Sequence, residues 1–101
     1  MLSVVQMAQE GRVVDDKVLT KNIERLRAGV EWCRARELSV MVADIVGSKP
    51  KILIETSAKC MRLVADGLAA EIGSQSSGGV YSRVMCVVAE ECQIMWVERG
   101  H

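Results

Sequence analysis

The sequence predicts a single small α+β domain spanning residues 1–101, folded as a two-layer sandwich with two helices on one face of an antiparallel sheet. Length and composition fit this class, because 101 residues that are 50% hydrophobic and 26% charged can form one domain with its own core. Two segments repeat apolar residues at helical spacing. Several others are rich in β-branched residues or alternate between apolar and polar residues, as strands do.

The N-terminal part of the chain predicts a strand followed by a helix. Residues 2–8 are β-branched and precede a polar stretch, which indicates a first strand, with a helical turn as the alternative. In the next segment, apolar residues recur at steps of four and three, which places them on one stripe of a helix. The members of this predicted core stripe are Leu19, Ile23, Leu26, Val30 and Cys33.

The middle of the chain predicts a β-hairpin and then a second helix. Residues 39–46 and 51–56 are strand-like, and Gly, Ser, Lys and Pro supply the turn between them. Ser57 is a suitable N-cap for a helix through residue 72, and Gly73 is a suitable C-terminal glycine. We expect a flexible loop over residues 73–79, which are Gly, Ser and Gln.

The C-terminal part predicts two more strands. Residues 80–88 are rich in Val, Glu90 and Glu91 form a turn, and residues 92–97 return as a last strand. A helix over residues 80–97 is the alternative, because apolar residues in this segment also fit helical spacing.

The expected element order is β-α-β-β-α-β, which is the ferredoxin-like arrangement, with an extra C-terminal edge strand. This expectation rests on the order of elements and on no kinship of sequence. Fold class by itself says little about function.

The charge pattern limits the classes of partner. The chain has 13 basic and 13 acidic residues, which argues against strong binding to nucleic acid or to anionic lipid through charge alone. Residues 17–62 carry ten basic and five acidic side chains, so we expect a basic side and an acidic side. No segment approaches the about 20 apolar residues of a membrane span, and residues 1–12 do not resemble a signal peptide. A small soluble protein in the cytoplasm is the expectation.

Residues suited to catalysis or metal binding are scarce. His101 is the single histidine and is the last residue, so the common nucleophile–histidine arrangements are disfavoured. The four cysteines, which have no metal-binding spacing, lie in apolar patterns typical of buried free thiols. We therefore expect a protein that is not an enzyme and has no metal or cofactor. These cysteines are Cys33, Cys60, Cys86 and Cys92.

The first helix carries a candidate interaction surface. Arg25, Gly29, Trp32 and Arg36 follow one another at steps of four, three and four, on a stripe beside the core stripe. A tryptophan between two arginines has the composition of a binding hot spot. The alternative is that Trp32 packs at the edge of the sheet while the arginines are merely solvated.

Three functional hypotheses follow. The first is a non-enzymatic protein–protein interaction or regulatory module that self-associates as a homodimer or docks on another protein, through an apolar helix face or an edge strand at residues 92–98. The second is a nucleic-acid-binding module that adds four further basic residues to the helix surface. The third is a small-molecule regulator or enzyme built on Asp44, Glu55 or Cys86. The four basic residues of the second hypothesis are Lys49, Lys51, Lys59 and Arg62.

Overall fold

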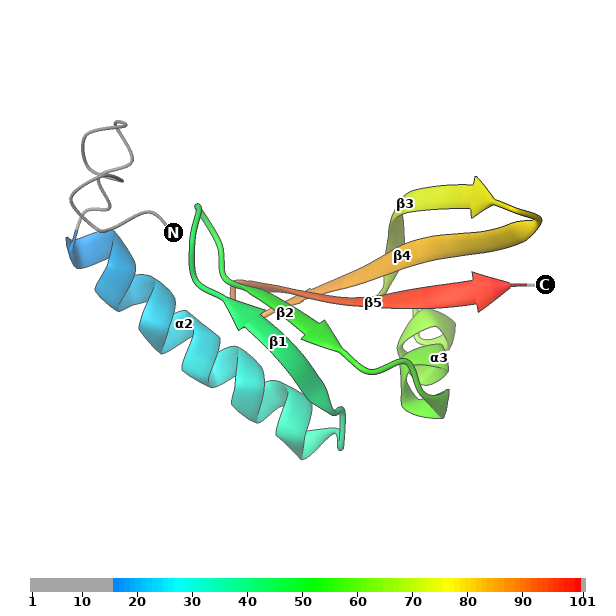
Figure 1. Cartoon of the computed structure of the whole chain (residues 1–101). Helices are drawn as coiled ribbons and strands as arrows, with labels where there is room; N and C mark the ends of the chain where they lie inside the picture. The colour runs from blue at the N-terminus through cyan, green and yellow to red at the C-terminus, as the bar shows by residue number, and fades with distance from the viewer. Residues whose placement is uncertain (1–15, 101) are drawn as a thin grey trace, which may run out of the picture.

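The computed structural model describes residues 16–100, which form two helices and a five-stranded sheet (Figure 1). The α+β class predicted from the sequence is confirmed. The strand predicted at residues 2–8 lies outside the described residues. In chain order the elements are α2 (Asp16–Ala35), β1 (Val40–Asp44), β2 (Lys51–Ile54), α3 (Ala58–Ala65), β3 (Ala70–Ser77), β4 (Val80–Ala89) and β5 (Cys92–Gly100).

The sheet is mixed, with strand order β1-β2-β5-β4-β3. β2 and β5 pair in parallel, and the other three pairings are antiparallel. The prediction of a wholly antiparallel sheet in ferredoxin-like order is therefore wrong in part. The last strand was expected at an edge, yet β5 lies between β2 and β4, and the edges are β1 and β3.

The two strands predicted near the C-terminus are confirmed, and the helical alternative for residues 80–97 is wrong. β4 and β5 form a long hairpin that pairs from Tyr81 with Gly100 to Ala89 with Cys92. A single helix would leave half of this Val-rich segment in solvent. The hairpin instead buries alternate residues of β5, from Cys92 to Trp96, and the three consecutive residues Met85, Cys86 and Val87 of β4.

The second helix is shorter than the predicted span of residues 57–72. Ser57 stands at the N-cap of α3 as predicted, but the helix ends at Ala65. Gly67 follows with a φ of 75°, in the left-handed region that favours glycine. The backbone N–H groups of Gly67 and Leu68 donate back to carbonyls of the last turn, each at 3.0 Å, in a Schellman ending.

Residues 70–77 are strand β3, where the sequence predicts the end of a helix and a flexible loop. β3 pairs with β4 from Ala70 opposite Cys86 to Ser77 opposite Val80. All eight of its residues are exposed. Their polar composition hid the strand, because an edge strand held by backbone pairing needs no apolar alternation.

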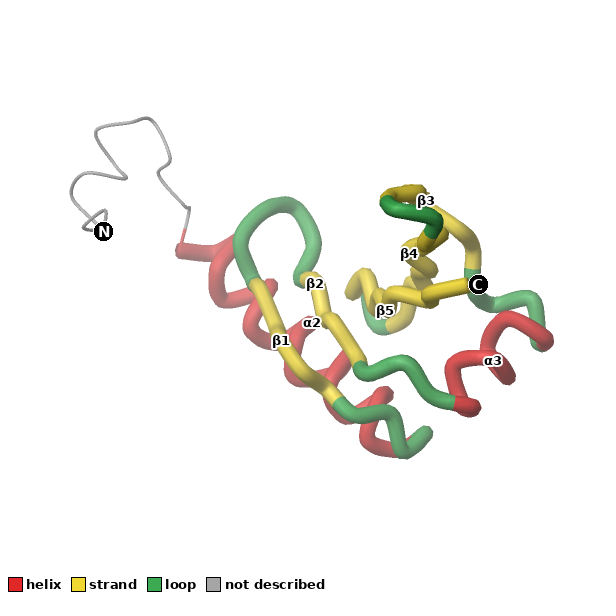
Figure 2. Tube along the Cα trace, turned by 45° about the vertical axis from the view of Figure 1, so that its right-hand side comes forward, coloured by secondary structure: helices red, strands yellow, loops and turns green. Residues whose placement is uncertain are grey.

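α2 packs on one face of the sheet, and Figure 2 shows it behind β1 and β2. Its buried residues are Asn22, Gly29 and Cys33, whereas Ile23 of the predicted core stripe is 51% exposed. The packed face of α2 is therefore rotated toward the stripe of Gly29 and Trp32. Gly29 sets this rotation, because the backbone there approaches the sheet too closely for any side chain.

The core lies between this face of the sheet and the two helices. Ile52 and Ile54 of β2, with Ile94 and Trp96 of β5, are each no more than 1% exposed. Cys60 and Leu63 of α3 belong to the same core cluster, so both helices cover one side of the sheet. The core also contains three fully buried free thiols, those of Cys33, Cys60 and Cys92.

Trp96 is anchored by a partly buried polar network, in which the Glu98 and Arg83 side chains are 13% and 35% exposed. Its indole Nε1 donates to Oε2 of Glu98 at 2.8 Å. Arg83, the register partner of Glu98, donates to Oε1 of the same carboxylate from Nη2 at 2.8 Å and from Nε at 2.9 Å. These hydrogen bonds hold the pKa of Glu98 below its ordinary value of 4.5, and the bond from Trp96 has the largest effect.

We predict that Gly29→Ala destabilises the protein. An alanine Cβ would lie 2.7 Å from Sγ of Cys92 and 2.9 Å from Cδ1 of Ile52, so these buried side chains or α2 itself must shift. The expected loss in the free energy of unfolding is about 1–3 kcal/mol, as for other overpacked cores. Chemical denaturation measures it. Gly73→Ala is the matched control, because no atom lies within 4 Å of its added Cβ, and equal losses in both variants would contradict the prediction.

We predict that Glu98→Gln lowers the free energy of unfolding near neutral pH and makes that free energy depend less on pH in the acid range. Because the folded pKa of Glu98 is lowered, its contribution is present above the unfolded value of about 4.3 and is lost as the pH falls through the folded pKa. The variant should lose about 1–2 kcal/mol at pH 7, the size of a hydrogen bond to a charged group. Trp96 fluorescence during urea unfolding, at pH 7 and below pH 4, provides the measurement.

Glu24→Gln is the control for this experiment, because Glu24 is exposed on α2. If both variants lose the same stability at pH 7, or if the gap between Glu98→Gln and the unchanged protein persists at the lowest pH, the role given to Glu98 is wrong.

Candidate interaction surfaces

The predicted surface on the first helix is divided in the structure. Gly29 is buried against the sheet and is part of no surface. Arg25 turns to the β4–β5 turn, where its Nε lies 3.1 Å from Oε2 of Glu91. Trp32 is partly buried and packs against the core cluster, as the alternative interpretation has it. Arg36 remains exposed, and its guanidinium stacks 3.9 Å above the Trp32 ring.

The four basic residues predicted to contact nucleic acid fall into two groups. Lys59 and Arg62 of α3 line a pocket of about 430 Å³ together with Arg36, at the point where α2 ends. Lys51 begins β2, and Lys49 lies in the preceding turn, away from this pocket. The structure therefore brings Arg36, Lys59 and Arg62 together at one pocket, and leaves Lys49, Lys51 and Arg25 elsewhere.

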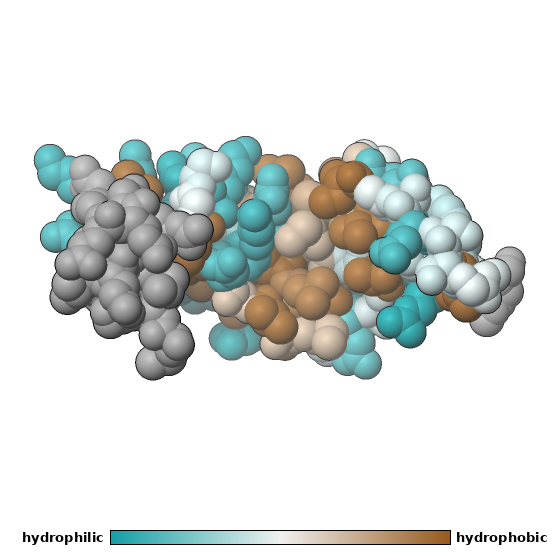
Figure 3. Space-filling view, turned by 45° about the horizontal axis from the view of Figure 1, so that its top comes forward, coloured by the Kyte–Doolittle hydropathy of each residue, from teal (hydrophilic) through white to brown (hydrophobic). Residues whose placement is uncertain are grey.

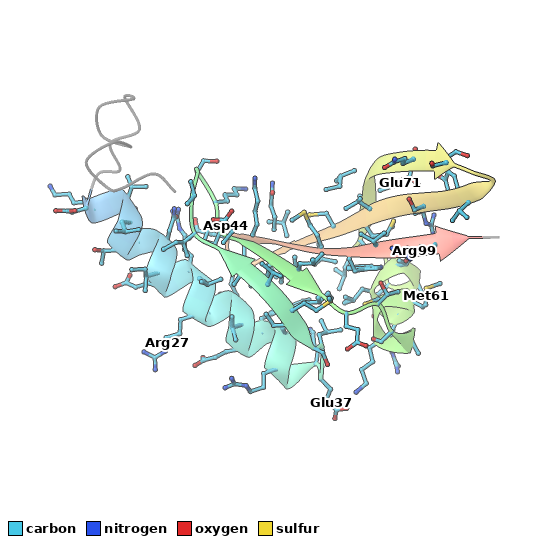
Figure 4. All side chains as sticks on the ribbon, viewed as in Figure 1. Arg27, Glu37, Asp44, Met61, Glu71 and Arg99 are labelled. Atoms are coloured by element: carbon cyan, nitrogen blue, oxygen red, sulfur yellow. The ribbon has the colours of Figure 1, made fainter. Side chains whose placement is uncertain are left out.

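The pocket wall combines charge with apolar surface. Lys59 of α3 forms an ion pair with Glu37, which lies two residues beyond the end of α2 and is labelled in Figure 4. This bond lowers the pKa of the Glu37 carboxyl. Leu38 and Leu63 are each 6% exposed and lie against the core, while Leu68 is 55% exposed. The arrangement offers cations beside a small apolar surface.

A second surface lies on the side of the sheet opposite the helices. Val42, Leu53, Met95, Cys86 and Ala70 are successive register partners, so they form one row across all five strands. The neighbouring residues Ile52 and Ile94 turn to α2, which places the row on the opposite face.

Further aliphatic residues extend this row. Val88 lies two residues from Cys86 on β4, and Val84 and Val97 are register partners on the other side of the row. Val42 and Val88 are 56% and 59% exposed. We call these aliphatic residues and Cys86 the open face. Its members are Val42, Leu53, Val84, Cys86, Val88, Met95 and Val97.

Charged residues border the open face. Asp44 and Lys51 are register partners at one end, and Arg99 lies beyond Val97 at the other. Figure 3, seen from above the view of Figure 1, shows hydrophobic residues gathered in the middle of the molecule with hydrophilic residues to both sides. An apolar centre with a charged rim is the common anatomy of a protein interface.

The side chains that the sequence offered for catalysis are either buried or far apart in the fold. Burial raises the pKa of Cys33 to about 11 and raises those of Cys86 and Cys92, which disfavours the reactive thiolate. Asp44 lies on β1 and Cys86 on β4, with two strands between them. Within residues 16–100, no three acidic, cysteine or histidine side chains are grouped to hold a metal ion.

Sequence reasoning missed the open face, although a signal for it exists. The predicted strands 39–46 and 80–88 are apolar at both odd and even positions, which indicates burial on two sides. That signal predicts a covered second face only when the strand order is known. The order of this sheet was not available from element spacing.

Comparison with known proteins gives a family and no more. In the part of the chain that the structure describes, neither helix has the length and apolar character to cross a membrane. No curated protein matches the sequence, and no solved structure matches the fold. A family model described as "Uncharacterised protein" matches residues 4–99, and the chain belongs to this family.

Proposed function

We propose that this protein is a non-enzymatic interaction module that forms a homodimer by packing its open face against the open face of a second copy. The observation that carries the proposal is the aliphatic row across five strands, opposite the face that α2 and α3 cover. A sheet with one apolar face in water is unusual, and large exposed apolar patches mark interaction sites.

The shape of the molecule supports a face-to-face partner. Its extents are 45 × 35 × 19 Å, so it is two layers thick and broad. A side of 45 by 35 Å has room for the about 800 Å² that each partner buries in a standard interface. Stacked sheets lie about 10 Å apart, so two copies would form a helix–sheet–sheet–helix sandwich in which the open face becomes a core.

Charge supports a second copy as the occupant. The chain has no formal net charge, so two copies do not repel one another strongly. The rim of the open face carries both signs, with Asp44 and Lys51 adjacent at one end. A copy of the same surface therefore meets acidic as well as basic groups. An aliphatic centre also suits an identical aliphatic centre.

The raised pKa values of the buried thiols support a function without catalysis. Burial raises the pKa of the Cys33, Cys86 and Cys92 thiols, so little thiolate forms near neutral pH. The carboxylate of Asp44 accepts a hydrogen bond from the backbone N–H of Val46 at 2.8 Å, as in an ordinary turn. His101 lies outside the described residues.

We predict that the full-length chain is a dimer whose association depends on the open face. Size-exclusion chromatography with light scattering should give twice the chain mass of 11.1 kDa. The double variant Val42→Lys, Val88→Lys should give a monomer, because two charges would be buried at the interface. Both side chains are exposed in the single chain, so its own fold should persist.

Ile23→Lys is the matched control, because Ile23 is 51% exposed but lies on α2, away from the open face. This variant should remain a dimer. A monomeric unchanged protein at high concentration would sink the proposal. So would a control variant that dissociates as readily as the double variant.

Nucleic-acid binding remains the second candidate, supported by the gathering of Arg36, Lys59 and Arg62 at one pocket. We predict no binding of a labelled single-stranded oligonucleotide at low salt, where electrostatic attraction is strongest. The reason is that the basic residues form two separate groups, each with a carboxylate beside it, Glu37 in one and Asp44 in the other. Binding that weakens steeply with added salt, measured by fluorescence anisotropy, would favour the nucleic-acid hypothesis.

A further inference from the structure

The pocket between the end of α2 and α3 has the construction of a small-molecule site. Its volume of about 430 Å³ lies in the range of ligand pockets, about 300–1,000 Å³. It is on the helix side of the molecule, so it does not depend on the homodimer proposed above.

The position of the pocket wall is fixed by the ending of α2. The backbone N–H of Leu38 donates to the carbonyl of Cys33 at 2.9 Å, and that of Glu37 to Arg34 at 3.0 Å. This Schellman ending requires Glu37 to adopt a φ of 58°. It sends the buried Leu38 side chain into the core and leaves Glu37 facing α3, where it pairs with Lys59. The wall is therefore fixed before any ligand arrives.

Two guanidinium groups at the pocket have no carboxylate partner in the part of the chain that the structure describes. Arg36 is held in place by stacking on the Trp32 ring at 3.9 Å and by donating from Nη1 to the Trp32 carbonyl at 3.3 Å. Arg62 makes no side-chain hydrogen bond or ion pair within residues 16–100. A guanidinium has five N–H donors in a planar fork that matches a carboxylate or phosphate group.

The charges at the pocket define the ligand that fits. The Lys59–Glu37 pair is neutral as a unit, which leaves Arg36 and Arg62 against Asp66. A single negative charge complements this set, whereas a polyanion would meet Asp66 and Glu37. The exposed Leu68, beside Leu38 and Leu63, offers surface to an apolar group.

We propose that this pocket binds a small amphiphilic oxyanion, whose carboxylate or phosphate group is held by Arg36 and Arg62 and whose short apolar body packs on Leu38, Leu63 and Leu68. The stacked Arg36 gives the site its direction. The charged head lies between Arg36 and Arg62, and the apolar body lies toward Leu68.

The test is a titration of the full-length chain with four probes: hexanoate, hexyl phosphate, hexylammonium and inorganic phosphate. Tryptophan fluorescence reads the result, because Trp32 lies beneath Arg36 while Trp96 is fully buried and supplies a constant background. Hexanoate, hexyl phosphate or both should saturate at one ligand per chain. Inorganic phosphate should bind more weakly, since it has no apolar body, and hexylammonium should not bind. The first two probes also tell a carboxylate site from a phosphate site.

Variants locate the binding. Arg36→Gln and Arg62→Gln should each lower the affinity for the tighter-binding anionic probe by about tenfold or more. A tenfold loss corresponds to the lower end of what a hydrogen bond to a charged group contributes. Leu68→Glu should do the same through charge and lost apolar contact. Arg27→Gln is the control, because Arg27 is 84% exposed and points away from the sheet (Figure 4), and its binding should equal that of the unchanged protein.

Three results would overturn the proposal. They are saturation by neither amphiphilic anion, equal binding of hexylammonium, and affinities in all three pocket variants that match the Arg27→Gln control. Melting temperatures of the variants separate a folding defect from lost binding. Should one arginine variant fail to fold, the other and Leu68→Glu still decide the question.

Discussion

The parallel pairing of β2 with β5 is the constraint on which the rest of the molecule depends. β1 and β2 form one hairpin, and β3, β4 and β5 form a separate antiparallel unit. Only three register pairs, beginning with Lys51 opposite Gln93, join the two units into one sheet. The aliphatic row across the five strands crosses this seam at Leu53 and Met95.

α2 clamps the seam from one side. A Cβ at position 29 would lie 2.9 Å from Ile52 of β2 and 2.7 Å from Cys92 of β5, so α2 passes close over both strands at Gly29. Sγ of Cys92 donates to the Arg25 carbonyl at 3.0 Å, and Oγ1 of Thr56 donates to the Val97 carbonyl at 2.5 Å. A side chain at position 29 would meet Cys92 and Ile52 at once, so the packing of α2 over the seam would loosen.

The sequence predicted what depends on neighbours along the chain and failed where distant contacts decide. The hairpin near residue 50 and the β4–β5 hairpin follow from turn residues and β-branched runs, and both are confirmed. β3 was missed because its Ser and Gly residues carry no strand signal, and its partner β4 supplies the order. The packed face of α2 was predicted at the wrong angle around the helix, because hydrophobic periodicity gives no weight to a glycine. Yet the missing side chain of Gly29 is what allows the helix to lie close to the sheet.

The candidate site shows the same division. Trp32 and Arg36 are four residues apart on a helix, and their stacking was within reach of helical spacing. Their meeting with Lys59 and Arg62 was not, because it requires α3 to return beside the end of α2. That return depends on Cys60 and Leu63 entering a core shared with Trp96. The residue pattern of one segment cannot predict a core that three separate segments build together.

The two faces of the sheet carry different kinds of stabilisation, and this difference bears on function. The helix face is complete: its large side chains are buried, and its polar groups are paired, as in the Trp96–Glu98–Arg83 network. On the open face no helix of residues 16–100 covers the sheet, and Val42, Val88 and Val97 are exposed, so these three side chains add to stability only when a partner covers them. Association therefore has a favourable free energy available on one side of the molecule and little on the other. Because the pocket at Arg36 and Arg62 lies on the completed side, a bound anion and a second copy of the chain would occupy different surfaces and need not exclude one another.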